Sequence, residues 1–539
     1  MKTCNMKYLL PHMKGKWPFL FFLIWFGGTY WMVSERFVDE TTAPKACFAL
    51  FGAVIFCALC TQNEFHGEIS RIFRFTDMAT AIMLCAVSQA IYVILQKTGI
   101  CAAPGTFPAC GSFDNPAGVA SALAFSLPFG LGLINRRHPY IQKVSWASMA
   151  IIVTGIIVSE SRSGILAACM VMFVFFVMRR KCIRKLWVIF PVVGFVAAVV
   201  FLYHYKQDSA DGRLLIWRCT WSVIRESPWI GHGIGGFQAR YMDAQADYFK
   251  AHPESPYVML ADNTQAPFNE YLGLLTEFGF AGGIILLVGA ALLLRAWWKH
   301  PCGSSRVAIL CLLSIAVFSL FSYPFRYAHT WLLCGISVVV LLFNAYSPAQ
   351  SVRRIIFLSA TLCFVGVSCF SIHRMRIEMC WREVATCSLG GMTDEMLPAY
   401  HKLYGELGKN PYFLYNYAAE LNVSGHYAES LRIGQECDAL MADYFVQLLM
   451  ADNCKQLKRY EQAKRYLGQA SYMCPNRFVP LYELYKIYEL QANTVAMCRM
   501  AEAILRKPIK VESSEVHRII AEMKRYKQGM KSALSNGYK

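Results

Sequence analysis

The amino-acid sequence predicts an all-α protein, in which a polytopic membrane bundle of about 11 transmembrane helices precedes a soluble α-solenoid. Three observations predict this. Residues 1–371 consist of apolar runs separated by short polar loops, whereas residues 372–539 are polar, charged and rich in tyrosine. Of the 539 residues, 56% are hydrophobic and 16% are charged, where a soluble protein has about 25% charged residues. In the C-terminal part, short motifs recur 33 residues apart.

Composition and charge also limit the classes of function. The shortage of charged residues excludes a soluble cytosolic enzyme and a disordered chain. The net charge of +18 would suggest nucleic-acid binding in a soluble protein. Here the apolar content favours membrane lipids as partners instead, because basic residues collect at the cytoplasmic edge of a membrane, and no nucleic-acid partner is expected. Many of the 21 cysteines lie within apolar runs, which is typical of buried thiols.

Each apolar run is compared with the bilayer core, which requires about 20 residues of helix. No small-residue cleavage site follows Gly28, so the first run is predicted to remain as a span. The predicted spans are 17–33, 44–60, 76–96, 116–134, 141–158, 163–178, 186–203, 274–297, 306–322, 328–345 and 355–371.

The loops between these spans predict the orientation. Loops on one side contain about 19 Lys and Arg residues and those on the other about 5. Because basic loops stay inside, the N-terminus is predicted to be cytoplasmic. An odd number of spans then places the C-terminal domain outside, which in a Gram-negative bacterium is the periplasm. The predicted domains are a membrane domain at 1–371 with a periplasmic loop at 204–273, connecting helices at 372–410 and a repeat domain at 411–530.

The loop at 97–115 is also predicted to lie outside, and it contains Cys101 and Cys110. An oxidising compartment permits a disulfide between them but does not require it. A disulfide and two free thiols both remain open.

The C-terminal domain contains an internal repeat. Tyr427 in Gly-His-Tyr-Ala-Glu-Ser corresponds to Tyr460 in Lys-Arg-Tyr-Glu-Gln-Ala, and Pro475 and Pro508 show the same offset. Helix-turn-helix units of about 34 residues have the period of tetratricopeptide repeats. A plain array of helical hairpins would give nearly the same pattern. Such stacks bind partners and seldom catalyse reactions, so this domain is expected to bind a protein partner or tune acceptor choice while the chemistry resides in the membrane part.

Polar motifs on the outer side are candidates for that chemistry, because charged residues at membrane depth are costly and usually functional. Arg162 lies in Ser-Arg-Ser-Gly between two apolar runs, although a turn with a snorkelling arginine would look the same. The long loop contains Arg213, Trp217 and a glycine cluster at 231–236 that includes His232. Such a cluster favours either close approach of a phosphate or a tight turn.

The loop ends in a second polar group, Asn269, Glu270 and Tyr271, followed by Glu277. Asn269 and Glu270 would also serve as helix caps. Arg326 and His329 lie in the last outer loop, where an interfacial anchor is the commoner role. The outer motifs contain no cluster of His, Cys, Asp or Glu at metal-binding spacing, so neither a metal nor a cofactor is expected.

Taken together, the motifs resemble the O-antigen ligase and O-antigen polymerase superfamily of bacterial inner-membrane glycosyltransferases, over residues 105–345. A C-terminal tetratricopeptide domain is found in some similar proteins. The motifs that carry the resemblance are Gly111–Pro116, Ser161–Gly164, Gly212 and Arg213 with Trp217, Pro228–Phe237, and Asn269–Leu272 with Glu277 and Gly279.

The resemblance implies a metal-independent, inverting transfer of a glycan from undecaprenyl diphosphate to lipid A–core or a related acceptor. Arg162 and Arg213 would bind the diphosphate, and Asn269, Tyr271 and Arg326 would also contact substrate. The ligases resembled carry a histidine where this chain has Phe268. The base is therefore sought first in Glu270, then in His329 and His232.

Other functions remain open at the level of sequence. An O-antigen polymerase or a protein O-oligosaccharyltransferase would use the same donor. A transporter of lipid-linked sugars would be expected to show intramembrane polar sites and two similar halves, and the sequence shows neither. A membrane scaffold for the repeat domain would need far fewer spans, since one helix is enough for stable insertion.

Overall fold

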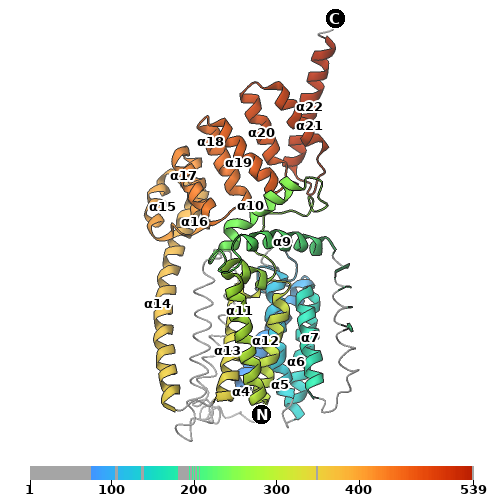
Figure 1. Ribbon diagram of the computed structural model, residues 1–539, viewed down its shortest axis with the longest axis vertical. Coiled ribbons are helices and arrows are strands. Elements are labelled where there is room, and N and C mark those ends of the chain that lie inside the picture. The colour runs from blue at the N-terminus through green and yellow to red at the C-terminus, as the bar shows by residue number, and fades with distance from the viewer. Residues whose placement is uncertain are drawn as a thin grey trace, which may run out of the picture. The chain divides into compact units, whose positions relative to one another are not determined.

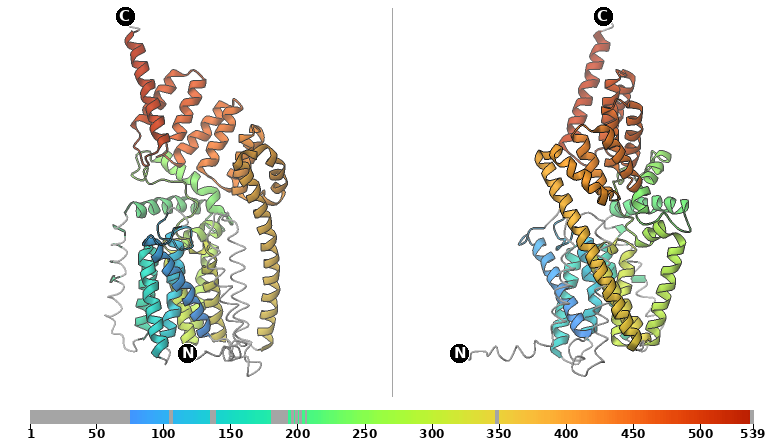
Figure 2. Two further views of the ribbon diagram at one scale, coloured as in Figure 1. Left: turned by 180° about the vertical axis from the view of Figure 1, so that it is seen from behind. Right: turned by 90° about the vertical axis from the view of Figure 1, so that its left-hand side faces the viewer.

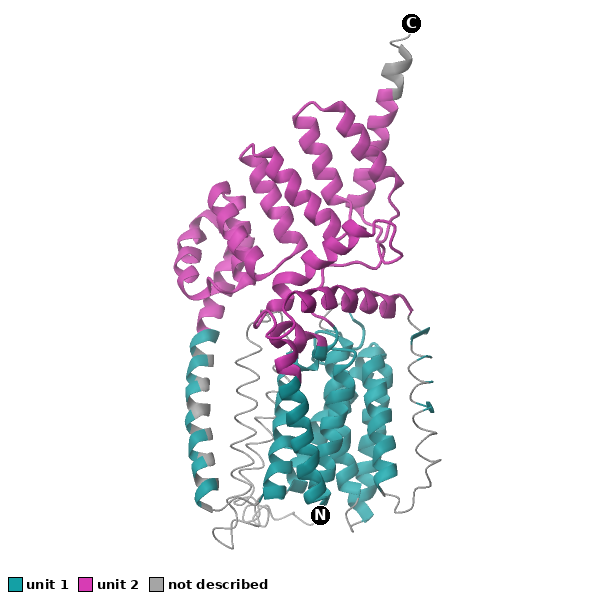
Figure 3. Cartoon of the chain, viewed as in Figure 1, with its two compact units in different colours: residues 1–205, 268–271, 284–375 teal, residues 206–267, 272–283, 376–539 magenta. Residues whose placement is uncertain are grey.

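The structure is a computed structural model that describes residues 75–536 apart from 104–106, 135–138, most of 180–206 and 347–349. The predicted spans 17–33 and 44–60, and most of 186–203, lie outside the described residues. All regular secondary structure in the described part is helical. The chain divides into two compact units that interleave along the sequence (Figure 3).

Unit 1 contains residues 1–205, 268–271 and 284–375. Helix α5 lies at the centre of a bundle and packs against α4, α6, α7 and α12, and α13 packs against α12 (Figure 1). A short 3₁₀ turn, η5, precedes the last bundle helix. The bounds are α4 (Phe75–Lys97), α5 (Pro116–Ile134), α6 (Pro139–Val158), α7 (Arg162–Arg179), α11 (Glu270–Lys299), α12 (Gly303–Ser319), η5 (Pro324–Arg326), α13 (Ala328–Tyr346) and α14 (Gln350–Cys387). Residues 272–283 of α11 and 376–387 of α14 belong to unit 2.

The helices of unit 1 have the length and composition of membrane spans. Among the described residues, α4, α5, α6, α11 and α13 are long and apolar enough to cross a bilayer, and α7 and α12 are shorter apolar helices. The apolar helix α11 exposes Ile285 and Leu287, which are 73% and 70% accessible. An apolar surface of this kind is stable against lipid and unfavourable in water, so the structure supports a membrane protein.

Unit 2 contains residues 206–267, 272–283 and 376–539. Two of its helices come from the segment between α7 and α11, and the others form a stack that follows the chain (Figure 2). The bounds are α9 (Gln207–Glu226), α10 (Gly236–Ala251), η6 (Ser388–Met392), α15 (Thr393–Leu407), α16 (Pro411–Val423), α17 (Tyr427–Leu440), α18 (Tyr444–Gln456), α19 (Tyr460–Met473), α20 (Val479–Leu490), α21 (Thr494–Arg506) and α22 (Ser514–Asn536).

The stack consists of consecutive helix pairs, α16 with α17, α18 with α19 and α20 with α21. Tyr427 and Tyr460, the residues that revealed the 33-residue offset, are the first residues of α17 and α19. Asn410 and Asp443 cap α16 and α18 with side-chain oxygens that accept backbone N–H groups. The repeat offset therefore corresponds to one helix pair. Both the tetratricopeptide prediction and a plain hairpin array share this arrangement.

Helix α10 packs against the second helices of two pairs, α17 and α19. Tyr241, Met242 and Ala246 are fully buried. Two carboxyl groups lie at this contact. Asp243 accepts a 2.6 Å hydrogen bond from Gln469, and Asp438 accepts one of 2.8 Å from Gln447. Burial, together with the neighbouring carboxylates of Asp243 and Asp443, raises the pKa of Asp438 from 3.8 to about 6.

This shift predicts how the stability of unit 2 depends on pH. A carboxyl group whose pKa is raised by folding binds its proton more tightly in the folded state, so its stabilising effect is complete below about pH 4 and is lost as pH rises through about 6. We expect Asp438→Asn to reduce this dependence by about 1–2 kcal/mol between pH 5 and 7.5. Thermal unfolding followed by circular dichroism would measure it. The exposed Asp394→Asn serves as control, and equal pH profiles for all three proteins would contradict the prediction.

Candidate functional site

Two buried glutamines of α4 hold the segment that leads into α5. Gln96 accepts hydrogen bonds from the backbone N–H groups of Cys110 and Gly111, at 3.1 and 2.7 Å, and donates to the Gly111 carbonyl at 2.9 Å. Gln89 donates to the hydroxyl of Ser112 at 2.8 Å. Irregular backbone inside a membrane bundle requires such internal partners because no water is available. Cys101 and Cys110 are free thiols.

This segment places Asp114 and Asn115 against the turn that contains η5. The hydroxyl of Tyr327 donates to the Asp114 carboxylate at 2.8 Å. The amide of Asn115 donates to the hydroxyls of Tyr327 and Tyr323, at 2.7 and 3.2 Å. The Asn115 side-chain oxygen also accepts the backbone N–H of Gly118 at 2.9 Å, which caps α5. Motifs more than 200 residues apart are thus joined through side-chain hydrogen bonds.

Glu270, the first residue of α11, reaches the same turn. Its carboxylate accepts the backbone N–H of Phe325 at 2.9 Å. The preceding Phe268 packs its ring edge-on against Tyr323, with 5.1 Å between centroids. The cluster of Asp114, Asn115, Glu270, Tyr323 and Tyr327 is referred to below as the outer-end cluster, after the side on which the Lys and Arg pattern predicts these loops.

The neighbours of Glu270 hold α11 in position. The Asn269 oxygen accepts the N–H of Tyr271 at 3.0 Å, in the geometry of a helix cap. The Tyr271 hydroxyl donates to the carbonyl of Ala316 in α12 at 2.9 Å. Both contacts fix the start of α11, and with it the position of Glu270.

Arg162 lies at the first residue of α7, beside the start of α5. A Cβ atom on Gly164 would lie 2.8 Å from the Cβ of Ala120, so the first turns of α7 and α5 pack closely. Lys97, at the end of α4, forms a 3.0 Å ion pair with Glu160. Arg162 therefore belongs to the same end of unit 1 as the outer-end cluster.

His329 and Arg326 also lie at this end, with different surroundings. His329 is completely buried, with its Nε2 atom 3.0 Å from the Ser121 hydroxyl and its ring stacked on Tyr327 at 5.8 Å. A base at this position would have to move before it could reach an acceptor hydroxyl. Arg326 places its guanidinium 5.7 Å from the ring centre of Tyr323.

The remaining predicted residues belong to unit 2. Arg213 lies in the middle of α9 and is half-buried. Trp217, one turn further along, donates its indole N–H to the carbonyl of Pro267 at 3.1 Å. This bond ties α9 to the end of the long segment just before Phe268.

The glycine cluster forms a close backbone junction with α11. The backbone N–H groups of His232 and Gly233 donate to the carbonyls of Thr276 and Glu277, both at 2.9 Å. The Gly235 N–H donates to the Glu277 carboxylate at 3.0 Å. These donors are committed to the protein, which favours the tight-turn interpretation of the cluster over a phosphate cradle. The His232 ring also has a structural partner, the Val223 carbonyl, at 2.9 Å.

Gly279 allows this junction because α11 kinks there with φ +60°. A Cβ atom at this position would overlap the carbonyl of Trp229. We expect Gly279→Ala to cost at least about 2 kcal/mol, since strained φ and the collision add together. Gly289→Ala in the same helix, where the added atom meets nothing within 4 Å, should be neutral. Thermal inactivation of both variants would measure the difference, and equal stability would contradict it.

Sequence alone does not single out Asp114, Asn115, Tyr323 or Tyr327 as site residues. Asp114 and Asn115 were present in the motif Gly111–Pro116, and an acidic residue just before a membrane helix was a usable signal. The two tyrosines gave no signal, because interfacial tyrosines are common in membrane proteins. Among the described residues, no group of three or more His, Cys, Asp or Glu side chains is arranged to hold a metal ion.

Residues 147–287 match the family model described as O-antigen ligase. This range runs from α6 into α11 and includes Arg162, Arg213 and Glu270, while Asp114, Arg326 and His329 lie outside it. No curated protein matched the chain. With the apolar helices of unit 1, the family match supports a glycosyltransferase-like membrane protein with an O-antigen ligase or polymerase type of function.

Proposed function

We propose that the protein is an O-antigen ligase-like glycosyltransferase that moves a glycan from undecaprenyl diphosphate to lipid A–core or a related acceptor. The single observation that carries this proposal is the outer-end cluster. There Glu270 at the start of α11, within the region that matches the O-antigen ligase family, bonds to the turn at 323–327, and Asp114 and Asn115 from another motif of the resemblance bond to the same turn. Carboxylate, amide and phenol groups at one end of an apolar bundle suit a sugar hydroxyl at the membrane surface.

Arg162 and Arg213 are assigned to the diphosphate of the donor. A guanidinium presents a planar fork of donors that matches phosphate oxygens. As the glycosidic bond breaks, negative charge builds up on the departing undecaprenyl diphosphate. Fixed guanidinium groups stabilise that charge in the transition state, and no metal ion is required.

Glu270 is assigned as the general base. The acceptor hydroxyl oxygen attacks the anomeric carbon, its proton passes to the Glu270 carboxylate, and the bond to the diphosphate oxygen breaks with inversion. Glu270 is preferred over His329, which is enclosed by the bundle, and over His232, whose ring bonds to Val223. The Phe325 N–H donates to the Glu270 carboxylate and so orients it at the start of α11.

Gene deletion distinguishes this proposal from its alternatives. A ligase requires that deletion removes long-chain lipopolysaccharide while lipid-linked polymer is retained. Accumulation of single repeat units would instead identify a polymerase. Loss of glycoprotein staining would identify a protein O-oligosaccharyltransferase, and accumulation of donor on the cytoplasmic face would identify a transporter.

We also propose that the protein lies in the bacterial inner membrane with its N-terminus in the cytoplasm and its repeat domain in the periplasm. The asymmetry of Lys and Arg supports this orientation. Alkaline phosphatase fused after Lys539 should therefore be active, because the enzyme folds only in an oxidising compartment. A fluorescent but phosphatase-inactive C-terminal fusion would place the domain in the cytoplasm and overturn both the topology and the site.

A further inference from the structure

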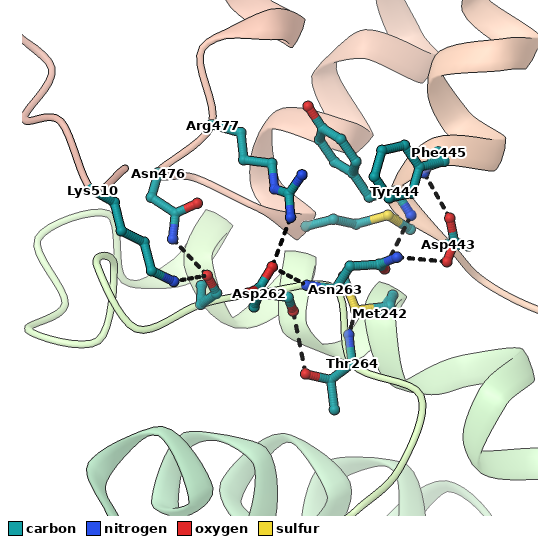
Figure 4. A network of polar contacts seen from close by, with 12 residues as sticks. Met242, Asp262, Asn263, Thr264, Asp443, Tyr444, Phe445, Asn476, Arg477 and Lys510 are labelled. Atoms are coloured by element: carbon teal, nitrogen blue, oxygen red, sulfur yellow. Dashed lines mark hydrogen bonds and ion pairs between the residues drawn. The ribbon is translucent and has the colours of Figure 1, made fainter. Parts of the chain in front are cut away.

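The segment that follows α10 is bound by the helical repeats within unit 2. The Ala261 carbonyl accepts hydrogen bonds from the Asn476 amide and from Lys510, at 2.5 and 3.2 Å. The next residue, Asp262, forms a 2.8 Å ion pair with Arg477. Figure 4 shows the repeat side chains converging on this short stretch.

Asp443 is the most highly connected group at this contact. One of its oxygens caps α18 by accepting the N–H of Phe445 at 2.7 Å. The other oxygen accepts the amide of Asn263 at 2.7 Å (Figure 4). The same oxygen accepts the amide of Gln265 at 2.8 Å. Because the helix cap fixes the carboxylate, it is already oriented for Asn263 and Gln265 and loses little entropy in binding them.

Gln245 of α10 adds a completely buried bridge. Its amide donates to the carbonyls of Met473 and Asp262, at 2.6 and 3.1 Å, and its oxygen accepts the Tyr241 hydroxyl at 2.6 Å. Leaving a buried polar group unsatisfied shifts an equilibrium by roughly tenfold or more. The half-exposed pair of Asp262 and Arg477 contributes less. Gln245 and 261–265, with Asp443, Met473, Asn476, Arg477 and Lys510, are termed the latch.

The latch is connected to Arg213 by helix packing and by one hydrogen bond. Helix α9, which carries Arg213, packs against α10. Trp217, one turn from Arg213, bonds to Pro267, two residues after Gln265. Displacement of 261–265 from the repeats would therefore release the segment to which α9 is attached.

We propose that the helical repeats hold the α9–α10 segment in place through the latch, and that Asn263 and Asp443 act as positioning residues for Arg213. This inference rests on the proposed function and deepens it, because it gives the repeat domain a part in binding the donor diphosphate. It also argues against the expectation that the chemistry is independent of the repeats. Removal of the repeats would expose the buried face of α10.

The positioning role of Asn263 and Asp443 is tested by a variant that introduces charge repulsion and by a second substitution that should relieve it. Asn263→Asp places two carboxylates against each other and should open the latch. Adding Asp443→Asn restores a donor and an acceptor with their roles exchanged, and asparagine still caps α18. The control is Arg506→Ala, which removes only an exposed pair with Glu502. Limited trypsin digestion followed by mass spectrometry reports opening by cleavage after Lys250.

We expect Asn263→Asp to speed this cleavage about tenfold and to raise the KM for the lipid-linked donor about tenfold. The double variant should restore both within about twofold, and the control should change neither. Partial unfolding alone would lower kcat and leave KM unchanged, because the molecules that remain folded bind donor normally. Faster cleavage with unchanged KM, or unchanged cleavage, would overturn the inference. If the wild-type protein transfers no glycan, the proposed function fails, while digestion still decides whether the latch holds the segment.

Discussion

Replacing Arg162 or Arg213 by alanine should lower glycan transfer by about 100- to 1000-fold. Each guanidinium is assigned to a leaving diphosphate, and loss of one preorganised donor from a water-excluded site has an effect of this size. Arg→Lys at either position should also impair transfer strongly, because lysine keeps the charge but loses the planar fork. The measurement is transfer from lipid-linked donor by purified protein, with insertion and protein level verified for each variant.

The matched control is Arg240→Ala, which removes a half-exposed arginine of α10 that pairs with Glu226 at 3.6 Å. This variant should transfer at nearly the wild-type rate, since exposed pairs contribute little. Metal chelators should leave wild-type transfer unchanged if the arginines act in place of a cation. Near-normal transfer by Arg213→Ala, or inactivation by chelator, would remove the diphosphate-binding assignment.

Glu270→Gln should lower kcat by about 100- to 10,000-fold, the usual contribution of a positioned general base. The amide oxygen of glutamine can still accept the N–H of Phe325, so the local structure is retained while the proton acceptor is lost. The effect should appear in kcat with little change in KM. Single-turnover kinetics with saturating donor would measure it.

Two neighbouring variants make this assignment specific. Asn269→Ala removes the cap of α11 and should cost about 1 kcal/mol of stability with most activity retained. Asp114→Asn is the sharper comparison, because Asp114 is the exposed carboxylate of the outer-end cluster. Full activity of Glu270→Gln together with loss in Asp114→Asn would transfer the role of base to Asp114.

Much of the local structure was predictable from the sequence. The predicted span 116–134 has the same bounds as α5, and 76–96 differs from α4 by one residue at each end. These predictions succeed because the length of an apolar run and the polar residues that flank it are local properties. The span at 355–371 ended with its apolar run, whereas α14 continues to Cys387, because the polar residues that follow also favour a helix.

The candidate site was less accessible to sequence analysis. That Arg162, Glu270 and Arg326 share one end of the bundle follows from counting alternate loops, and the contacts of unit 1 agree. The hydrogen-bond partners of these residues could not be predicted from the loop count. Glu270 binds a backbone N–H 55 positions away, and no periodicity or motif spacing encodes a contact of that kind.

By itself the sequence determined the helical class, the membrane character and the 33-residue unit of the C-terminal stack, because each depends on composition or on short-range period. Tertiary structure decided the roles of individual polar residues. It assigned the glycine cluster to a backbone junction with the kink of α11, where only glycine fits. It also grouped residues 206–267 with the repeats in one compact unit, because buried polar contacts such as those of Gln245 and Asp443 form only when distant segments meet.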